Sequence, residues 1–447
     1  MATGRTWGGR IFLRWRGRCE VREVRLTRLA SQVVICVALT LRAANASGQT
    51  PTDPLPTTVT IEQVMDLFAQ RSPRTIADRA TVGVVAADRI TARTLPNPTI
   101  SYGGVHLVTG LSTGAVTQHQ VVLEQPLLMF GQRQARTDAA DLNVRAEQAR
   151  VGDTLAQRRL AVRQAFATLL SRQEQLRVVE ASLADLERVQ QVVRGRADAG
   201  ERSRYDVVRI ETETETLRVQ VINAQTDVED AAGQLASLLG FPGWSPRATG
   251  ALTPGDVPTD VNALWETAQT RRPSIVAIRQ QQAAARGGVF LAQRERLPVP
   301  AVSGGTQVTN DVTGTSAFFG FSMPLPFFDR NQGAIAKANA QVNADQRALE
   351  AELAEAHADV ERAANVLVRR REALTRLESQ VVQRTPILRQ MAEDAYREGS
   401  ADILELLDAM RSLKDIQLTH VQQLESTKLA EEAVVSAAGL DAPADTY

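Results

Sequence analysis

The chain has little of what most catalytic and disulfide-stabilised domains depend on. Only 2 of its 447 residues are cysteines, and both, Cys19 and Cys36, fall in an N-terminal leader. The rest of the chain therefore has no disulfide, no thiolate metal ligand and no cysteine nucleophile. We expect no metal site and no cofactor, because no two of the 4 histidines have the spacing of metal ligands on one element: His106, His119, His357 and His420.

Aromatic residues and net charge are also scarce. Phe, Trp and Tyr make up 4% of the chain, which suits long helices rich in Ala, Leu, Val and Gln better than a globular core. Lys plus Arg and Asp plus Glu both total 51, so the charge gives no reason to expect nucleic acid as a partner. The sequence contains no phosphate-binding loop and no locally supported Ser, His and Asp arrangement, and we interpret the chain as a non-enzyme.

Long hydrophobic runs are absent except for one near the N-terminus. Arginine-rich residues Arg14 to Arg28 precede an apolar run from Leu29 to Leu41, and Ala44-Asn45-Ala46 provides a small-x-small cleavage site. At about 13 residues the run is too short to span a membrane as a helix. We therefore predict a signal peptide over residues 1–46. Lipidation at Cys36 is the less favoured alternative, because Ile35 precedes it where a lipid-modification site needs a small residue.

What the chain has instead is a long heptad pattern from Gln132 to Asp198. Apolar residues return every seventh position, and a second seam is offset from the first by three or four residues. Two seams at that offset are the a and d lines of a coiled coil, and the helix would be roughly 100 Å long. Gly200 ends it, and a second helix from Ser203 to Leu239 completes a hairpin. The seams are Leu155, Val162, Leu169, Leu176 and Leu183, and Ala165, Val179, Leu186 and Val193.

The same hairpin occurs twice, about 198 residues apart. The seam returns from Leu353 through Leu388 to Ala395, the helix ends at Gly399, and a return helix follows from Asp402 to Ala438. Stretches that flank the two hairpins, such as Gly103-Gly104 and Gly304-Gly305, repeat at nearly the same interval. We therefore divide the mature chain into an extended segment (47–58), a first repeat (59–240), a Gly/Pro-rich crossover linker (241–260), a second repeat (261–439) and a tail (440–447).

Each repeat also contains a shorter helix followed by two strand-like runs. Four strands with one apolar face do not close a barrel, and an open edge cannot lie in lipid because its amides would lack partners. Three chains would supply twelve strands. We therefore expect a mainly α fold with a small β part, in which four transmembrane strands per chain complete a 12-stranded barrel in a trimer. The alternative is a small soluble sheet that caps a coiled-coil rod. The runs are Thr99–Thr109, Thr117–Gln125, Ala301–Thr309 and Ser316–Met323, and Phe319, Phe321 and Met323 share one face of the last.

This order of elements resembles the TolC family of trimeric outer-membrane efflux channels, and the resemblance covers residues 59 to 440. Its motifs include Leu95-Pro96-Asn97-Pro98 before the first strand, Pro126 and Pro324 at strand exits, and the two hairpin tips. The tips read Gly200-x-x-Ser203-x-x-Asp206 and Tyr396-x-x-Gly399-Ser400-x-Asp402, the latter leading into Glu405-Leu406-Leu407-Asp408-Ala409.

The segment from Pro324 to Gly333 is similar to the branch of this family that serves heavy-metal (cobalt-zinc-cadmium type) pumps. The resemblance implies a homotrimer in outer-membrane lipid, with a helical domain that reaches through the periplasm. It also implies two protein partners, a periplasmic adaptor (membrane fusion) protein and an inner-membrane pump of the resistance-nodulation-division type. The hairpin tips would be the adaptor-docking ends: Gly200, Ser203, Asp206, Gly399, Ser400 and Asp402.

The resemblance also implies a gate at the periplasmic entrance, with Glu405 and Asp408 forming acidic rings and Tyr396 holding the turn shut. Three like charges around an axis attract cations and repel one another. The alternative is that both acids are solvated residues in the first turns of a helix, where the macrodipole favours them. Ala401 stands where a typical member has a basic residue that bonds to the tyrosine, so a salt bridge there is not expected.

We therefore predict a passive outer-membrane duct of a tripartite efflux system that carries heavy-metal cations. Two alternatives of the same class are a drug-efflux channel and the outer-membrane part of a type I protein secretion system. An alternative of another class is a periplasmic coiled-coil scaffold without a pore. An adaptor is less favoured, because a tandem duplication does not fit one hairpin between split globular halves.

Overall fold

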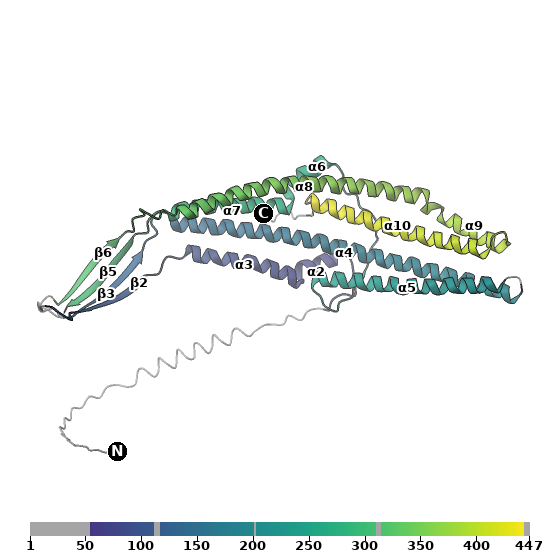
Figure 1. Cartoon of the computed structure of the whole chain (residues 1–447), viewed down its shortest axis with the longest axis horizontal. Coiled ribbons are helices and arrows are strands. Elements are labelled where there is room, and N and C mark those ends of the chain that lie inside the picture. Colours follow the sequence, from purple (N-terminus) through teal and green to yellow (C-terminus); the bar gives the residue numbers. More distant parts are fainter. Residues whose placement is uncertain (1–53, 111–116, 201–202, 310–313, 442–447) are drawn as a thin grey trace, which may run out of the picture. The chain divides into compact units, whose positions relative to one another are not determined.

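The computed structural model describes residues 54–110, 117–200, 203–309 and 314–441 (Figure 1). The predicted signal peptide, the tail beyond residue 441 and most of the predicted extended segment lie outside the described residues. The chain divides into two units, residues 1–55 and 56–447. Both repeats belong to the second unit, which is described by itself below.

In its described residues the second unit is mainly helical, with a four-stranded sheet and a short two-stranded pair, so the prediction of a mainly α fold with a small β part is confirmed. The first repeat contains, in order, β1 (Thr58–Val59), α2 (Ile61–Gln70), α3 (Pro73–Arg93), β2 (Thr99–His106), β3 (Thr117–Pro126), α4 (Gln132–Asp198) and α5 (Arg204–Leu239). Strand β4 (Arg247–Ala248) lies in the crossover linker. The second repeat contains α6 (Val261–Arg271), α7 (Pro273–Glu295), β5 (Ala301–Thr309), β6 (Thr315–Ser322), α8 (Gln332–Gln380), the short 3-10 helix η2 (Val382–Arg384), α9 (Thr385–Glu398) and α10 (Ile403–Ala437).

Local sequence explains where the helices begin. Thr60 caps α2 through a capping box with Gln63. Pro73 and Pro273 open α3 and α7, where a missing backbone N–H costs nothing. At the two strand-to-helix turns, Gly131 and Asn331 adopt left-handed conformations with φ of 78° and 58°. These residues occupy equivalent places in the two repeats, so the duplication is visible in the backbone itself.

Helix α4 runs without interruption for 67 residues, as the heptad pattern predicts. Val162, Leu169, Val179, Leu186 and Val193 are buried along it. It packs against α3, α5, α7 and α10, and Figure 1 shows it running beside all four. Helices from both repeats therefore pack against α4.

The second hairpin departs from the predicted pattern. The seam is buried at Val360, Leu367 and Leu374, but α8 ends at Gln380 and the chain passes through η2 before α9 begins. Leu388, predicted to lie in the seam, is 49% exposed. The physical reason is Pro386 in the first turn of α9, because proline has no N–H for the helical ladder and clashes with the preceding turn. The prediction of continuous helix through this region is wrong.

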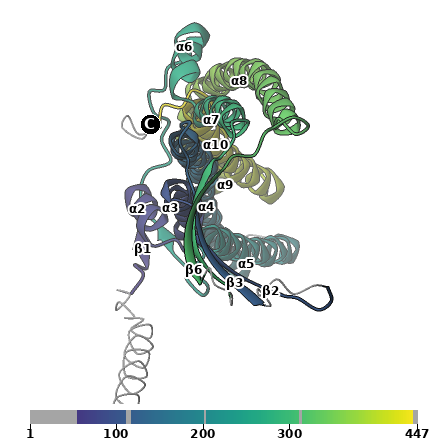
Figure 2. The same ribbon diagram turned by 90° about the vertical axis from the view of Figure 1, so that its left-hand side faces the viewer.

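The four longer strands form one antiparallel sheet with the order β2-β3-β5-β6. Each repeat supplies one hairpin, and β3 pairs with β5 over nine residue pairs, from Gln118↔Thr309 to Pro126↔Ala301. Each strand is joined to a long helix, and Figure 2 shows the sheet in front of the helix ends. The helices α3, α4, α7 and α8 contact one another in the same order as the strands to which they are joined.

The crossover linker is anchored at both ends. Strand β1 pairs in parallel with β4, and the indole nitrogen of Trp244 donates to the Pro56 carbonyl oxygen at 2.9 Å. Further along, the buried carboxylate of Glu431 accepts from the Gly255 amide at 2.9 Å and pairs with Arg371 at 3.1 Å. The linker is thus fastened to α8 and α10, beside a hydrophobic cluster built from α6, α8 and α10.

Candidate functional site

The two hairpin tips are made by left-handed glycines followed by capped helices. Gly200 and Gly399 have φ of 79° and 80°, a conformation that suits residues without Cβ. Ser203 caps α5, since its hydroxyl accepts from the Tyr205 amide at 3.1 Å. The Ser400 hydroxyl donates to the Ala395 carbonyl oxygen at 3.0 Å. Asp206 lies in the first turn of α5. The tip residues thus have clear structural roles, and their role in docking an adaptor stays a prediction.

Glu405, predicted as a gate residue, is also half of a capping box. The Asp402 carboxylate accepts from the Glu405 amide at 2.8 Å, and the Glu405 carboxylate accepts from the Asp402 amide at 3.2 Å. Asp408 lies one turn further along α10, and both Glu405 and Asp408 are exposed. The structure therefore places two acidic side chains near the second tip, one of which stabilises the start of α10.

Tyr396 is not exposed beside these acids. It is 4% exposed and belongs to a hydrophobic cluster shared by α4, α5, α9 and α10. The Arg196 guanidinium lies 6.0 Å from the centre of its ring and donates to the Arg397 carbonyl oxygen at 3.1 Å. Tyr396 therefore packs between the first and second hairpins, and its role in holding the gate shut stays a prediction.

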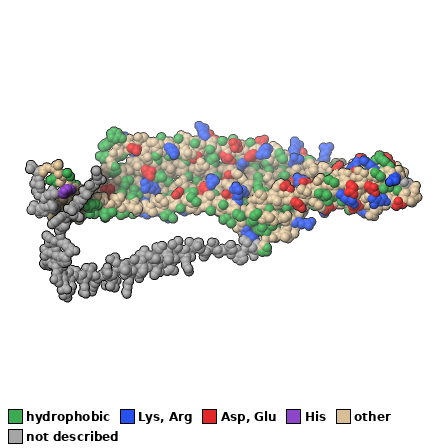
Figure 3. Space-filling view, turned by 60° about the horizontal axis from the view of Figure 1, so that its bottom comes forward, with side chains coloured by type: hydrophobic (Ala, Val, Ile, Leu, Met, Phe, Trp, Pro, Cys, Tyr) green, Lys and Arg blue, Asp and Glu red, His purple; other side chains and the backbone are tan. Residues whose placement is uncertain are grey.

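The sequence reasoning missed the ion pairs that join the hairpins, two of which lie toward the tips. Arg389 of α9 pairs with Asp185 of α4 and with Glu393 at 3.0 Å. Arg411 of α10 donates hydrogen bonds to both carboxylate oxygens of Glu213 of α5, and its Nε lies 2.7 Å from Oε1. Figure 3 shows acidic and basic side chains crowded together over the end that carries the tips.

The Arg411–Glu213 pair had a signal that could have found it. The two residues are 198 positions apart, close to the repeat interval, so they lie at nearly the same distance from the tips on the two return helices and carry opposite charges. Hydrogen bonding from Arg411 holds the pKa of Glu213 below its usual value, against the opposing effect of burial, and the same contact raises the pKa of Arg411. The pair is charged at neutral pH and links the two repeats.

The sheet has one apolar and one polar face. Strand register places Phe319 opposite Gly304, Gly304 opposite Leu123, and Leu123 opposite Ile100, so these residues share one face. Large side chains there are well exposed, with Phe319 at 92%. The other face is mostly polar. The exposed apolar set is Ile100, Tyr102, Val121, Leu123, Val302, Val308, Phe319 and Phe321, and the polar set includes Ser101, Gln118, Gln120, Glu124, Ser303, Gln307 and Ser316.

More exposed apolar side chains lie in the segments that join the sheet to the helices. Phe328 is 95% exposed and Phe327 is 67% exposed. Aromatic side chains at such positions are typical of a membrane–water boundary. Others in the same segments are Leu95, Met129, Phe130 and Leu325. Among the helices of the described ranges, none has the length and apolar character needed to cross a membrane.

Each of the four histidines has a hydrogen-bonding or packing contact with a neighbouring side chain. His119 bonds to the Tyr102 hydroxyl at 2.6 Å, and His106 bonds to that of Thr117 at 2.9 Å. His357 packs edge-on against Trp265, and His420 contacts Glu378 at 3.0 Å. Within the described part of the chain, no group of three or more His, Cys, Asp or Glu side chains could hold a metal ion.

Comparison with known proteins agrees with this arrangement. The family model described as outer membrane efflux protein matches residues 65–241 and 264–440, one stretch in each repeat. The cobalt-zinc-cadmium resistance protein CzcC of Cupriavidus metallidurans is 25% identical over 347 residues, which are 77% of this chain and 81% of that protein. The pyoverdine export outer membrane protein OpmQ of Pseudomonas putida is 26% identical over 268 residues, which are 58% of this chain and 56% of that protein.

The fold also matches solved structures. The CusC channel superposes with a TM-score of 0.69 at 17% identity, and the alignment covers 87% of this chain and 95% of that one.

Proposed function

Because this chain belongs to the outer membrane efflux protein family, we propose that it forms the passive outer-membrane duct of a tripartite efflux system. In this proposal three copies close the sheets into a barrel of twelve strands, and the helices below close into a tunnel. The energy for transport comes from an inner-membrane pump. The duct itself performs no chemistry.

The observation that carries the proposal is that the edge strands of the sheet are joined to the edge helices of the helical layer, so both layers have their open edges on the same sides. The outer strands are β2 and β6, and the outer helices of the matching layer are α3 and α8, which continue from them. Strand β6 runs antiparallel to β5, β5 to β3, and β3 to β2. When β6 of one copy meets β2 of the next, the antiparallel alternation is preserved, so the ring closes without a mismatch.

Strand number favours three copies over two. Two copies would give eight strands, and the interior of such a barrel is filled by side chains. Three copies give twelve, which leaves a water-filled lumen for cargo. The apolar face of the sheet then faces lipid and the polar face lines the lumen. The exposed aromatic residues between sheet and helices, such as Phe327 and Phe328, would lie at the periplasmic boundary of the membrane.

The partners we propose are a periplasmic adaptor protein and an inner-membrane pump of the resistance-nodulation-division type. The adaptor would dock at the tips formed around Gly200 and Gly399. The cargo we favour is a heavy-metal cation, because the similarity to CzcC covers most of both chains and the segment from Pro324 to Gly333 resembles the same branch. The similarity to OpmQ supports export of a larger organic molecule as the second candidate.

The gate we propose is the ring of Glu405 and Asp408 side chains from three copies, at the periplasmic entrance. The links between hairpins through Tyr396, Arg389 and Arg411 would hold it closed. Acidic rings favour passage of cations. Opening then requires that these links rearrange.

Two experiments test the proposal. The first is the mass of the protein extracted from outer membranes in detergent, which we expect to be that of a homotrimer. A soluble monomer or dimer would instead support the coiled-coil scaffold. The second is growth of a deletion strain, beside its complemented parent, on divalent metals and lipophilic drugs. Sensitivity to cobalt, zinc or cadmium alone is the expected result, and sensitivity to drugs alone would contradict the metal assignment.

A further inference from the structure

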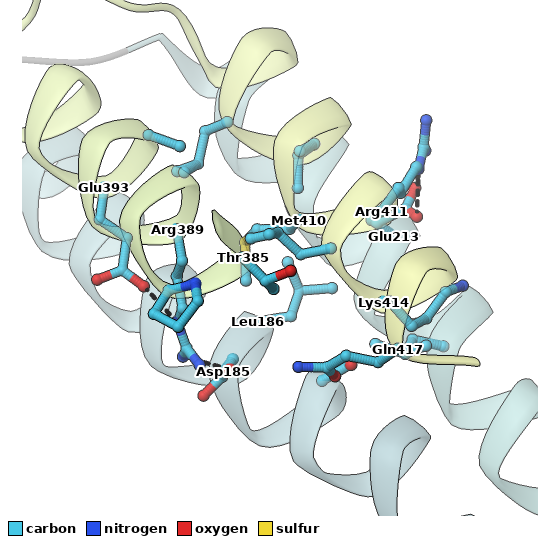
Figure 4. A pocket seen from close by; sticks show the side chains of 17 residues that line it. Asp185, Leu186, Glu213, Thr385, Arg389, Glu393, Met410, Arg411, Lys414 and Gln417 are labelled. Carbon is cyan, nitrogen blue, oxygen red and sulfur yellow. Dashed lines mark hydrogen bonds and ion pairs between the residues drawn. The ribbon is translucent and has the colours of Figure 1, made fainter. Parts of the chain in front are cut away.

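A cavity of about 190 Å³ lies between the two helical hairpins, close to the tips (Figure 4). One wall comes from α4 and α5 of the first repeat, and the other from α9 and α10 of the second. It lies directly beside the helix break, since Thr385 and Pro386 of α9 are part of its lining. Arg389 and Arg411, which link the hairpins, are part of its lining, but the space itself has no role in the proposed duct.

The most deeply buried part of the cavity wall is apolar. Leu186 and Leu217 come from the first hairpin, and Leu406, Leu407 and Met410 come from the second. The four leucines are at least nine-tenths buried. Apolar cavities of about 150 Å³ bind a benzene ring, so the space is of the size for one aromatic ring with a small substituent.

Charged groups in the lining balance one another. The carboxylates are Asp185, Glu213 and Glu393, and the cations are Arg389, Arg411 and Lys414. Asp185 and Glu393 both pair with Arg389, and Glu213 pairs with Arg411. The ammonium of Lys414 donates to the Gln220 amide oxygen at 2.9 Å and lies 3.6 Å from the Asp415 carboxylate. Because the lining has no net charge, an ionic ligand would lose its hydration without gaining a counter-charge.

Neutral polar groups complete the lining. Thr385 is 7% exposed and lies near the centre of the side chains drawn in Figure 4. Gln417 contributes a primary amide from an exposed position on α10. The Thr385 hydroxyl donates to the Val381 carbonyl oxygen at 3.3 Å and can still accept a hydrogen bond, whereas the primary amide of Gln417 can both donate and accept.

We propose that this cavity is a binding site for a small uncharged amphipathic molecule, with a body the size of one aromatic ring and a hydroxyl or amide substituent. Since its walls belong to both hairpins, a bound molecule stabilises their present arrangement relative to any other. Binding does not depend on the proposed function. Its effect on conduction does, because a duct gated at the tips would then respond to the ligand.

The test uses three probes that share a para-ethylphenyl body and differ in the charge of their polar group, titrated calorimetrically into the full-length protein in detergent. They are para-ethylbenzyl alcohol, para-ethylbenzylammonium and para-ethylbenzoate. We expect the alcohol to bind at least about tenfold more tightly than either ion. Equal binding of all three, or no binding of the alcohol, would overturn the proposal.

Variants locate the site. Glu393→Gln removes one negative charge and should improve binding of para-ethylbenzoate about threefold or more, while Lys414→Gln should do the same for the ammonium probe. Lys337→Gln, an exposed lysine on α8, is the matched control and should change neither. Ala392→Met and Ser182→Met reduce the cavity from opposite walls, and each should weaken the alcohol at least about tenfold. Unchanged binding in both filling variants would place the probe elsewhere.

Bilayer recordings separate this inference from the proposed function. The alcohol should lengthen the dwell time of one conductance level in the unmodified protein but not in Ala392→Met. Calorimetric binding without any conducting pore would contradict the duct and leave the site intact. A normal pore whose dwell times do not change when the probe is bound would contradict the effect of the ligand on conduction.

Discussion

Single residues near the second tip have more than one role. Glu405 both caps α10 and carries one of the charges that we assign to the gate. A change to alanine would remove its half of the capping box together with the charge, since the Asp402 amide would lose its side-chain partner. Variants that keep the hydrogen bond while removing the charge are therefore more informative.

The gate prediction is tested with Glu405→Gln combined with Asp408→Asn. Glutamine can still accept from the Asp402 amide, so the capping box survives. We expect the cation preference of the pore to fall severalfold in reversal-potential measurements, with the trimer unchanged in stability. Glu398→Gln, which removes another charge near the same turn, is the control. Undiminished cation selectivity in the double variant would remove both acids from the gate.

The ion pair between Arg411 and Glu213 predicts a dependence on pH. Hydrogen bonding from Arg411 lowers the pKa of Glu213 from its usual value near 4.5. The link is therefore fully present above pH 4.5, and it is lost as the pH falls through the lowered pKa, when the carboxyl is protonated. Because Arg411 is 42% exposed, we expect the effect on hairpin association to be about 1 kcal/mol.

The pH prediction is measured as the frequency of pore opening between pH 6 and pH 3. Opening should become more frequent as the pH falls below 4.5. In Arg411→Met this rise should be smaller, because the link is already absent at neutral pH. An identical pH profile in the two proteins would show that this pair does not restrain the hairpins.

At the scale of elements, the break between α8 and α9 is the clearest difference between the two repeats. The first hairpin has the unbroken α4, whereas the second has Pro386 and a 3-10 turn at the corresponding height. Pro386→Ala supplies the missing N–H, and we expect α8 and α9 to join. The amides of Val381 to Arg384 should then exchange with solvent about tenfold more slowly.

Hydrogen exchange followed by mass spectrometry measures the exchange rates of these amides in Pro386→Ala and in the unmodified protein. The control is Pro54→Ala, a change in the described N-terminal segment far from the break along the sequence. No slowing at residues 381–384 would mean that Pro386 is not the cause of the break.

The sequence predicted the elements well because their determinants are local. Gly200 and Gly399 ended the helices where expected, and strand β5 has the predicted bounds, Ala301–Thr309. The break was missed because apolar residues continue at seven-residue spacing through Leu388, although Pro386 was a signal against it. The hairpin links were missed for another reason: whether Arg389 meets Asp185 or another acid depends on how distant helices pack, which periodicity does not encode.

At the scale of the whole molecule, the two faces of the sheet predict which substitutions membrane insertion tolerates. Phe319 lies on the apolar face and Gln307 on the polar face. Phe319→Arg should cost about 2 to 4 kcal/mol if that face contacts lipid, and the amount of trimer in outer-membrane fractions should fall several-fold. Gln307→Arg introduces the same side chain on the other face and should leave the amount of trimer nearly unchanged. Equal losses in both would contradict the assignment of faces.

The two open edges of the sheet have a genetic consequence. The two edge strands, β2 and β6, are not equivalent. In the proposed ring the β6 edge of each chain therefore pairs with the β2 edge of the next. A subunit with a damaged β6 edge still joins a neighbour through β2, and it then leaves a ring that cannot close. If half of the subunits in a cell carry such a defect and mix at random, only about one ring in eight is intact. Alleles that damage one edge should therefore be dominant, whereas alleles that prevent folding should be recessive.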